Sequence, residues 1–420
     1  MKVLVVGGGG REHAVIHKLL ENKTIEKIWC APGNGGISAE AECVDIKATD
    51  VDNMVKFAKD NGADFCVVTP DDPLALGMVD QMEAVGIPCF GPHANAAIIE
   101  ASKAFSKNLM KKYGIPTAAY EIFDNPEEAM AYIKEKNQFP VVLKADGLAL
   151  GKGVLIAETL EDAKAAVREL MIDRMFGKAG NKIVVEEFMT GKEVSVLAFT
   201  DSKVIKPMVS SMDHKRADDY DQGLNTGGMG TIAPSPYYTP EITERCMQEI
   251  FLPTLKAMNA EGRPFKGCLY FGLMLTKDGP KVVEYNCRFG DPETQVVLPL
   301  LKSDLFDIMR ACHDETLADM DIEWSTDACA CVVEASGGYP VKYQKGYEIH
   351  GLDEKGQHEG VFVYHAGTKK ENGKYYTNGG RVIGITAKAP TQKEAIVRAY
   401  AAVEEIGFKD VHYRHDIGQK

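Results

Sequence analysis

The sequence contains no Cys-x-x-Cys pair, although ten cysteines are distributed along its 420 residues. This absence excludes the usual zinc ribbon and the thioredoxin-type redox motif. Scattered single cysteines are typical of buried free thiols in a reducing compartment, and we interpret them in that way. The positions are Cys30, Cys43, Cys66, Cys89, Cys246, Cys268, Cys287, Cys312, Cys329 and Cys331.

Long apolar runs and excess positive charge are also missing. No apolar run approaches the roughly 20 residues of a membrane span. The apolar run within the opening MKVLVVGGGG is also too short for a signal peptide. We therefore expect a cytoplasmic protein with no membrane partner. With 48 Lys and Arg against 61 Asp and Glu, the net charge is −13. Such a chain has no global field that attracts nucleic acid, although it can still bind anions locally.

The composition that remains is ordinary for a globular protein, with 45% hydrophobic and 26% charged residues. The length suggests about three domains. Over the first hundred residues, short apolar segments alternate with helical ones, which predicts an α/β domain with a doubly wound parallel sheet. The expected strands are 3–6, 25–30, 65–69 and 87–90, and the expected helices include 51–60.

The pattern changes after a predicted helix at 102–113 and becomes α+β. Residues 210–236 are polar and rich in glycine, and we expect a long loop there, which at that length is usually functional. An Asp-Gly turn at 278–279 should join strands 267–276 and 281–286. Short strands and a closing helix from 392 to 406, capped by Thr391, predict a small α+β domain from 328 to 420. The remaining expected elements are the strands 141–144, 153–157, 182–187 and 194–200 and the helices 160–171 and 240–260.

A strand at 281–288 carries the strongest chemical pattern. Side chains alternate along a strand, so Glu284, Asn286 and Arg288 should share one face. Carboxylate and amide oxygens suit Mg²⁺, and the arginine suits a phosphate. A solvated polar face with a surface ion pair would produce the same spacing, so both interpretations stay open.

A glycine-rich loop follows the predicted strand that ends at Lys144. Gly147, Gly151 and Gly153 would allow close backbone approach to an oxyanion, and Lys152 adds charge. The loop differs from a P-loop because Lys152 is followed by glycine and the next element is a strand. A flexible hairpin is the alternative.

Three further segments could bind a ligand. Glu186, Glu187 and Phe188, followed by Glu193, could serve a nucleotide, although exposed glutamates before a turn are commoner. Gly7–Gly10 could hold a phosphate at a helix N-terminus, but Glu12 breaks the dinucleotide fingerprint. The charged 213–216 and the small residues of 225–230 could wrap a polar substrate. We assign His214 no acid–base role.

Together these segments resemble the phosphoribosylamine–glycine ligase family, also called glycinamide ribonucleotide synthetases, which are ATP-grasp enzymes. The resemblance runs through essentially the whole chain, and NTGGMG with EYNCRFGDPETQ is its most specific part. The matching segments are GGREHA at 9–14, APGNGG at 31–36, KADGLALGKGV at 144–154, DHKR at 213–216, NTGGMG at 225–230, EYNCRFGDPETQ at 284–295 and TNGGRV at 377–382.

The resemblance implies an N-terminal substrate domain at 1–102, an ATP-grasp domain at 103–327 with a mobile lid near 120–190, and a C-terminal α+β domain at 328–420. It implies ATP-dependent ligation of glycine to 5-phosphoribosylamine through glycyl phosphate, in purine synthesis. The implied metal is Mg²⁺ or Mn²⁺, the implied partners are small molecules, and we expect a monomer or weak dimer.

The resemblance also implies a role for individual positions. Metal ligation falls to Glu284 and Asn286, and catalysis to Arg288, Lys144 and Asp213. ATP binding falls to Lys103, Lys144, Gly147, Gly151, Lys152, Gly153, Glu186, Glu187, Phe188 and Glu193. Binding of glycine and the amine falls to Asp213, Lys215, Gly290, Asp291 and Pro292, and binding of the phosphoribosyl group to Gly8, Gly9, Gly10, Glu12, His13, Asn34 and Gly35.

The sequence departs from the family pattern at three places. The segment CLYFGLMLT at 268–276 lacks the acidic metal ligand of many ATP-grasp enzymes, so we expect fewer protein ligands. Thr69-Pro70-Asp71-Asp72 replaces a more usual Gly-Pro-Glu loop, and Gly8 stands where asparagine is common.

Three alternative functions remain. FGDPETQ disfavours an ATP-grasp carboxylase that uses bicarbonate, and the broken fingerprint disfavours an NAD-dependent oxidoreductase. Retention of Glu284, Asn286 and Arg288 disfavours a catalytically silent nucleotide-binding scaffold.

Overall fold

The computed structural model describes residues 1–148, 153–175 and 177–419. Its N-terminal part is the predicted doubly wound domain, a parallel sheet in the order β3-β2-β1-β4-β5. Leu4 and Val6 pack in one apolar cluster with helices α2 and α4, whereas Val3 and Val5 pack in another with α1, because side chains alternate between the sheet faces. The elements are β1 Lys2–Gly7, α1 Gly10–Leu19, β2 Lys27–Pro32, β3 Glu42–Cys43, α2 Val51–Asn61, β4 Phe65–Val68, α3 Asp71–Ala75, α4 Met78–Ala84, β5 Cys89–Phe90 and α5 Ala94–Ala101.

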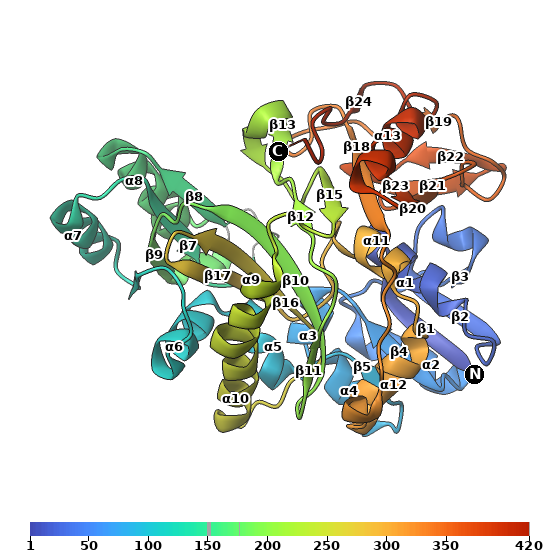
Figure 1. The fold of residues 1–420 in the computed structure, drawn as a ribbon, viewed down its shortest axis with the longest axis horizontal. Helices are drawn as coiled ribbons and strands as arrows, with labels where there is room; N and C mark the ends of the chain where they lie inside the picture. The colour runs from blue at the N-terminus through green and yellow to red at the C-terminus, as the bar shows by residue number, and fades with distance from the viewer. Residues whose placement is uncertain (149–152, 176, 420) are drawn as a thin grey trace.

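A small lobe with its own apolar core stands at the far left of Figure 1. Its antiparallel sheet has the order β6-β9-β7-β8 and carries α7 and α8. The helix expected over 160–171 is α-helical only to Val167 and continues as a π-helical turn from Arg168 to Ile172. The elements are β6 Tyr120–Phe123, α7 Pro126–Lys136, β7 Val141–Ala145, β8 Val154–Ala157, α8 Leu160–Val167 and β9 Ile183–Glu187.

A second antiparallel sheet, in the order β11-β10-β16-β17, lies between the small lobe and the N-terminal sheet (Figure 1). Thr276 pairs with Gly279, so the turn consists of Lys277 and Asp278, one residue earlier than expected. Gly279 is the first strand residue, with a φ of +122° that favours glycine. The elements are α6 Lys103–Tyr113, β10 Lys192–Asp201, β11 Ile205–Pro207, α9 Pro240–Cys246, a π-helical turn Met247–Phe251, α10 Leu252–Ala260, β16 Lys266–Thr276 and β17 Gly279–Asn286.

The expectation of a long loop at 210–236 is wrong. This segment contains β12 Met212–Asp213, β13 Arg216–Asp218, β14 Gln222–Asn225 and β15 Gly230–Ala233. β12 and β15 join the C-terminal sheet, whose order is β12-β15-β18-β23-β20. Strands of two to four residues are too short to show alternation, and β15 pairs with a partner about 100 residues away, so local patterning did not reveal them.

The C-terminal part is the predicted small α+β domain. A three-stranded sheet, β19-β22-β21, accompanies the larger sheet, and β24 pairs with β18. Helix α13 begins after Thr391, whose hydroxyl accepts from the Glu394 N–H at 3.2 Å, as predicted. The elements are α11 Thr294–Val297, α12 Leu305–Asp314, β18 Ala328–Ser336, β19 Glu348–Ile349, β20 Phe362–His365, β21 Thr368–Glu371, β22 Lys374–Thr377, β23 Arg381–Ala389, α13 Gln392–Val403 and β24 Val411–His412.

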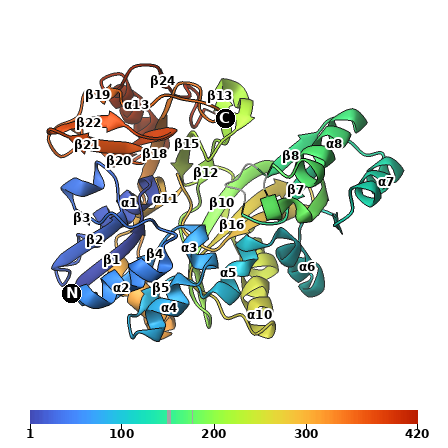
Figure 2. The ribbon, with the colours of Figure 1, turned by 180° about the vertical axis from the view of Figure 1, so that it is seen from behind.

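The N-terminal and C-terminal sheets lie on the same side of the molecule, away from the small lobe, as Figure 2 shows from behind. The chain's C-terminal end lies beside β13 in both views. Among the described residues, no helix combines the length and apolar character needed to cross a bilayer. The remaining short turns are 3₁₀-helical and comprise Ile37–Ala39, Gly177–Asn181, Asp219–Asp221, Leu298–Leu300 and Leu317–Asp319.

Candidate active site

The end of β17 brings Asn286 and Arg288 onto one carboxylate. Asn286 Nδ2 donates to Glu100 Oε1 at 2.7 Å, and Arg288 Nη2 donates to the same oxygen at 2.8 Å. The Cys287 N–H donates to Glu100 Oε2 at 2.7 Å. Glu100 lies near the end of α5 and was missed by the sequence reasoning, because a single glutamate in an apolar helix carries no motif.

Glu284 lies two residues before Asn286 on β17 and is surrounded by several cationic side chains. Burial alone would raise its pKa, but Lys215 and Lys144 hold the pKa below the usual glutamate value. Lys215 Nζ is 3.7 Å from Glu284 Oε1. Tyr285 and Cys287 point the other way into the core, so the predicted division of faces is confirmed. The carboxylate of Glu284 is therefore ionised in a positively charged setting.

The side chains at 284 and 286 fit a hard divalent cation. Because the Glu100 carboxylate accepts from the amide nitrogen of Asn286, the amide oxygen is left for another partner. No group of three or more His, Cys, Asp or Glu side chains that could hold a metal occurs in the described ranges. A site of one carboxylate and one amide suits Mg²⁺, which keeps several waters and substrate phosphates as its other ligands. β16 contributes no acidic ligand, in line with the sequence analysis.

Two predicted lysines reach the same region from neighbouring elements. Lys144 on β7 donates to the carbonyl of Val283 at 3.2 Å and lies 3.1 Å from Glu186 Oε2. Lys103, at the start of α6, donates to the carbonyl of Gly147 at 3.0 Å. Burial lowers the pKa of Lys103. The Ser102 hydroxyl accepts from the Phe105 N–H and caps this helix, which fixes Lys103 as its first residue.

Glu186 is buried between two lysines rather than open to a slot. Its Oε2 is 3.1 Å from Lys144 Nζ and 3.2 Å from Lys107 Nζ. Burial lowers the pKa of Lys107 to about 8, although Glu186 opposes the shift. Lys107 was not singled out from the sequence. The other carboxylate oxygen of Glu186, Oε1, is buried without a hydrogen-bond partner among the described residues.

The other predicted nucleotide residues come from the end of β9 and the residue that follows it, from β10 and from the segment between β7 and β8. Glu187 is exposed and accepts from the Ala119 N–H at 3.3 Å, and Phe188 is half-buried. Glu193 is exposed and lies 3.8 Å from Lys215 Nζ. Gly153 accepts from the Ala145 N–H at 2.8 Å. Gly151 and Lys152 lie outside the described residues. Gly147 has a φ of +151°, and a Cβ there would meet the side chain of Ala179 at 2.8 Å.

Asp213 and Lys215 line a small recess between β10 and β16, together with Glu193, Ser195, Tyr270 and Gly272. Burial and the nearby Glu293 raise the pKa of Asp213 well above its usual value. Burial would lower the pKa of Lys215, but Tyr270 and Glu193 raise it. Glu293 was missed by the sequence reasoning; its Oε1 accepts from Tyr270 Oη at 3.1 Å.

A cavity of about 380 Å³ opens between the N-terminal and C-terminal parts. Gly8, Gly9 and Asn34, which the resemblance assigns to the phosphoribosyl group, line it together with Asp291, which the resemblance assigns to glycine and the amine. Its opposite wall was not predicted, since it comes from segments without a recognisable motif apart from TNGGRV. That wall consists of Tyr339, Tyr343, Ala366, Gly367, Thr368, Asn378, Gly380 and Arg381.

Other residues predicted for this cavity support it from behind. Glu12 is 1% exposed and accepts from the Gly9 N–H and from Thr69 Oγ1, both at 2.6 Å. His13 Nδ1 accepts from the His365 N–H at 2.8 Å. Thr69, one of the departures from the family pattern, thus shapes the glycine turn through Glu12.

The remaining residues predicted to bind substrates lie where the backbone closely approaches neighbouring residues. A Cβ on Gly10 would meet the Gln295 amide at 2.6 Å, and one on Gly35 would meet the Lys369 backbone at 2.7 Å. A Cβ on Gly290 would meet Glu293 at 2.5 Å. Pro292 lies against Gly228, where an added Cβ would be 2.4 Å from the proline Cδ. These positions shape the walls of the site.

Comparison with family models decides the relationship. The model of the phosphoribosylglycinamide synthetase N domain matches residues 1–100, the ATP-grasp (A) domain model matches 101–294, and the C domain model matches 329–420. The chain belongs to the phosphoribosylglycinamide synthetase family. It is therefore a ligase that forms a C–N bond. This membership decides against the NAD-dependent alternative.

Relatives in the phosphoribosylglycinamide synthetase family match from end to end. The phosphoribosylamine–glycine ligase of Caldanaerobacter subterraneus subsp. tengcongensis is 48% identical over 417 residues, covering 99% of both chains. That of Clostridium acetobutylicum is 47% identical over 419 residues, covering 100% of both. The crystal structure of the Thermotoga maritima phosphoribosylamine–glycine ligase matches with a TM-score of 0.87 at 32% identity, covering 100% of both chains.

The fold extends beyond the phosphoribosylglycinamide synthetase family. The biotin carboxylase domain of Hydrogenobacter thermophilus 2-oxoglutarate carboxylase, crystallised with MgADP, ADP and bicarbonate, matches with a TM-score of 0.73 at 19% identity. The match covers 98% of this chain and 91% of that domain. At that identity the likeness concerns the fold alone.

Proposed function

We propose that the chain joins glycine to 5-phosphoribosylamine at the expense of ATP, forming glycinamide ribonucleotide, ADP and phosphate in de novo purine synthesis. The observation that carries the proposal is the gathering of cationic side chains around Glu284. Lys215, Lys144 and Lys103 all lower its pKa, and so does Arg288. A triphosphate beside an acid that holds a cation requires such surroundings.

The chemistry proceeds in two balanced steps. A glycine carboxylate oxygen attacks the γ-phosphorus of ATP, the bond to the β-phosphate oxygen breaks, and glycyl phosphate and ADP form. The amine of phosphoribosylamine then attacks the acyl carbon, phosphate leaves with the bonding electrons, and the nitrogen loses a proton. No covalent bond between enzyme and substrate is needed. The buried Cys287 fits this scheme, because burial raises the pKa of its thiol and keeps it protonated.

The side chains then act by alignment and charge neutralisation. Lys103, Lys144 and Arg288 contact the transferred phosphoryl group and offset its charge. Glu284 and Asn286 would hold Mg²⁺ or Mn²⁺, which when bound neutralises charge on the nucleotide phosphates. Gly147 and Gly153 border the phosphates, and the segment 186–188 with Glu193 receives the nucleoside.

Glycine is a zwitterion, and the recess offers charges of both signs. We place its ammonium group at Asp213 and its carboxylate at Lys215. An ammonium group there would favour the ionised form of Asp213, whose pKa is raised in the free protein by burial first and then by Glu293. Ser195 and Tyr270 close the recess beside them. Gly290, Asp291 and Pro292 separate this recess from the larger cavity and border the acyl carbon.

The larger cavity receives the phosphoribosyl group. Backbone N–H groups at the start of α1 favour a phosphate at Gly8 to Gly10, supported by Glu12 and His13. Arg381, from the C-terminal part, also lines the cavity, and its Nη1 donates to the Gly227 carbonyl at 2.8 Å and to the Asp291 carbonyl at 2.9 Å. Its guanidinium thus links this cavity to the 225–230 loop.

The proposal also covers the domain organisation of the chain. Residues 1–102, 103–327 and 328–420 act as the substrate, ATP-grasp and C-terminal units, with 120–190 moving as a lid. The C-terminal sheet borrows β12 and β15 from the middle unit, so the units share a framework. We also propose that the protein works in the cytoplasm as a monomer or weak dimer.

A coupled assay of ADP release tests the function. ADP should form only when glycine and freshly prepared phosphoribosylamine are both present, and bicarbonate should not replace glycine. Arg288→Ala should lower kcat by roughly 10³-fold, by analogy with other charge-neutralising arginines. Arg263→Ala, whose guanidinium donates to the Asn95 carbonyl and lines neither of the two cavities described above, should stay near wild type. Substrate-independent ADP release, or normal turnover by Arg288→Ala, would refute the assignment.

A further inference from the structure

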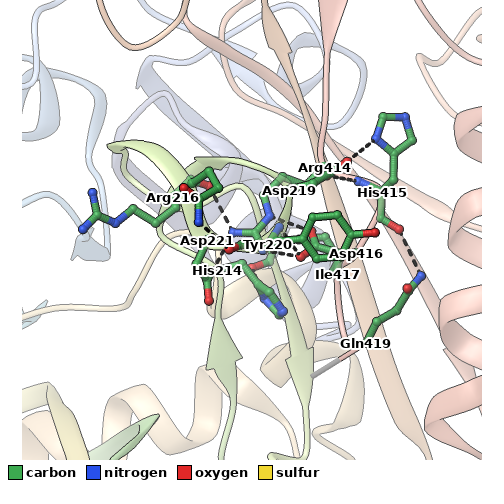
Figure 3. Close-up of polar contacts among 12 residues, drawn as sticks. His214, Arg216, Asp219, Tyr220, Asp221, Arg414, His415, Asp416, Ile417 and Gln419 are labelled. Carbon is green, nitrogen blue, oxygen red and sulfur yellow. Dashed lines mark hydrogen bonds and ion pairs between the residues drawn. The ribbon is translucent and has the colours of Figure 1, made fainter. Parts of the chain in front are cut away.

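The C-terminal tail, defined here as residues 411–419, crosses the β13–β14 hairpin (Figure 3). Arg414 is fully buried, and its Nε and Nη2 donate to Asp416 Oδ1 and Oδ2 at 2.8 and 2.7 Å. Its Nη1 donates to Asp221 Oδ1 at 3.0 Å and to the Arg216 carbonyl at 3.2 Å. One guanidinium therefore ties the tail to the first strand of the hairpin and to its turn.

The same tail fixes the turn of the hairpin through two further contacts. Asp416 Oδ2 accepts from the Tyr220 N–H at 2.9 Å, and the His415 N–H donates to Asp219 Oδ1 at 2.7 Å. Tyr220 has a φ of +57° and is 81% exposed, so apolar burial does not hold this turn. Polar contacts with the tail supply its order instead (Figure 3).

A last contact reaches the residue between Asp213 and Lys215. The Gly418 N–H donates to His214 Nε2 at 3.1 Å. Because Nε2 accepts, the ring proton is on Nδ1, which lies 3.2 Å from the Gly230 carbonyl. Ile417, also fully buried, packs where a Cβ on Gly230 would be 2.6 Å from its Cδ1. His214 is thus fixed between β15 and the tail.

We propose that the tail is a positioning element for the glycine recess, holding Asp213 and Lys215 in register through His214 and the hairpin. The proposal rests on the function proposed above. No tail residue lines either cavity described above, so the tail acts only through other residues. A buried ion pair adds little stability compared with apolar packing, but it imposes one geometry. Small displacements of binding groups reduce rates strongly.

Arg414→Lys in the full-length chain tests the proposal, because lysine keeps the charge but cannot span Asp416, Asp221 and the Arg216 carbonyl together. The KM for glycine should rise roughly 10- to 100-fold. The KM for ATP should rise less, because only Lys215, of the two residues that the tail positions, forms an ion pair with Glu284. Trypsin should also cleave faster after Arg216. Arg398→Lys on α13, which contacts only the Lys388 carbonyl among the described residues, is the control. Equal rises in both KM values, or an unchanged glycine KM, would overturn the proposal.

A second pair of variants guards against a failure of Arg414→Lys to fold. His214→Gln retains an acceptor oxygen near the position of Nε2, whereas His214→Leu does not. Glycine KM should rise for the leucine variant and recover towards wild type for the glutamine variant. Equal values for the two variants would contradict the positioning role. If wild type shows no glycine dependence at all, the proposed function fails, and cleavage after Arg216 still decides whether the tail orders the hairpin.

Discussion

At the residue scale, Glu100 determines how two functional side chains are presented. Its two oxygens accept from Asn286, Cys287 and Arg288. An ionised carboxylate accepts hydrogen bonds but cannot donate them. Glu100 therefore binds the nitrogen of the Asn286 side-chain amide and leaves the amide oxygen for another partner. Outer partners of this kind usually matter nearly as much as the ligands they orient.

Glu100→Gln should weaken divalent metal binding in the presence of ATP by roughly 10- to 100-fold. Glutamine has a single acceptor oxygen, so when its amide nitrogen takes the place of Oε1, both Asn286 and Arg288 lose their acceptor and the amide of Asn286 is free to turn. Mn²⁺ titration followed by electron paramagnetic resonance measures the binding without turnover. Glu261→Gln, whose partners Lys112 and Tyr113 lie on α6, is the matched control. Unchanged Mn²⁺ affinity would exclude an orienting role.

The sequence predicted Glu284, Asn286 and Arg288 as a shared face because the pattern is local to one strand. It did not predict Glu100 or Lys107. The Asn286–Glu100 contact spans 186 residues, and no spacing rule reaches that far. The sequence also did not predict that Lys107 and Lys144 pair with one side-chain oxygen of Glu186, whose assignment to an adenine slot stays a prediction.

At the element scale, the loop between β14 and β15 depends on a glycine. Gly228 has a φ of +119°, and a Cβ there would lie 2.4 Å from Pro292 Cδ and 2.6 Å from Asp213 Oδ1. The loop therefore approaches both the 290–292 segment and the glycine recess as closely as a backbone allows.

Gly228→Ala should raise the KM for glycine and lower the stability by about 1–3 kcal/mol. The added carbon would push Asp213 away while straining the backbone. Gly262→Ala separates these effects, since Gly262 also has a positive φ, +68°, but nothing lies within 4 Å of its Cβ position. Steady-state kinetics and urea unfolding measure the two quantities. A Gly228→Ala variant with glycine kinetics like those of Gly262→Ala would show that contact with Asp213 is unimportant.

Elements with strong local patterns were predicted well. The strand pair β16–β17 was placed within two residues, because it combines an apolar run with a turn signal. The shift of its turn to Lys277 and Asp278 followed from Gly279 pairing as a strand residue. By contrast, the segment that contains β12 to β15 was predicted to be a loop. These short strands are held in place by β18 and by the tail, both of which are distant in the sequence.

At the scale of the whole molecule, buried histidines lie where the N-terminal and C-terminal parts meet. Burial lowers the pKa of His365 to about 4 and that of His13 well below its usual value. His365 Nδ1 lies 3.0 Å from Thr368 Oγ1, and Thr368 lines the larger cavity. Protonation of these rings therefore opposes the packing of the two parts.

The free energy of unfolding should fall as the pH drops from about 6.5 to about 4. In that window the unfolded chain binds a proton at His365 that the folded chain does not, so stability rises with pH. The full effect of one such group is about 3 kcal/mol, from 1.36 kcal/mol per pKa unit. Urea unfolding at several pH values measures the slope, and His365→Gln should reduce it. An identical slope in that variant would assign the pH dependence to other groups.

The larger cavity has walls from the two ends of the chain, Gly8 and Gly9 on one side and Tyr339 and Arg381 on the other. During synthesis on the ribosome, the first wall emerges long before the second. A nascent N-terminal domain, even when fully folded, thus has only half of this binding surface. The proposed capture of the sugar phosphate therefore begins only once the final quarter of the polypeptide has been made and folded against the first.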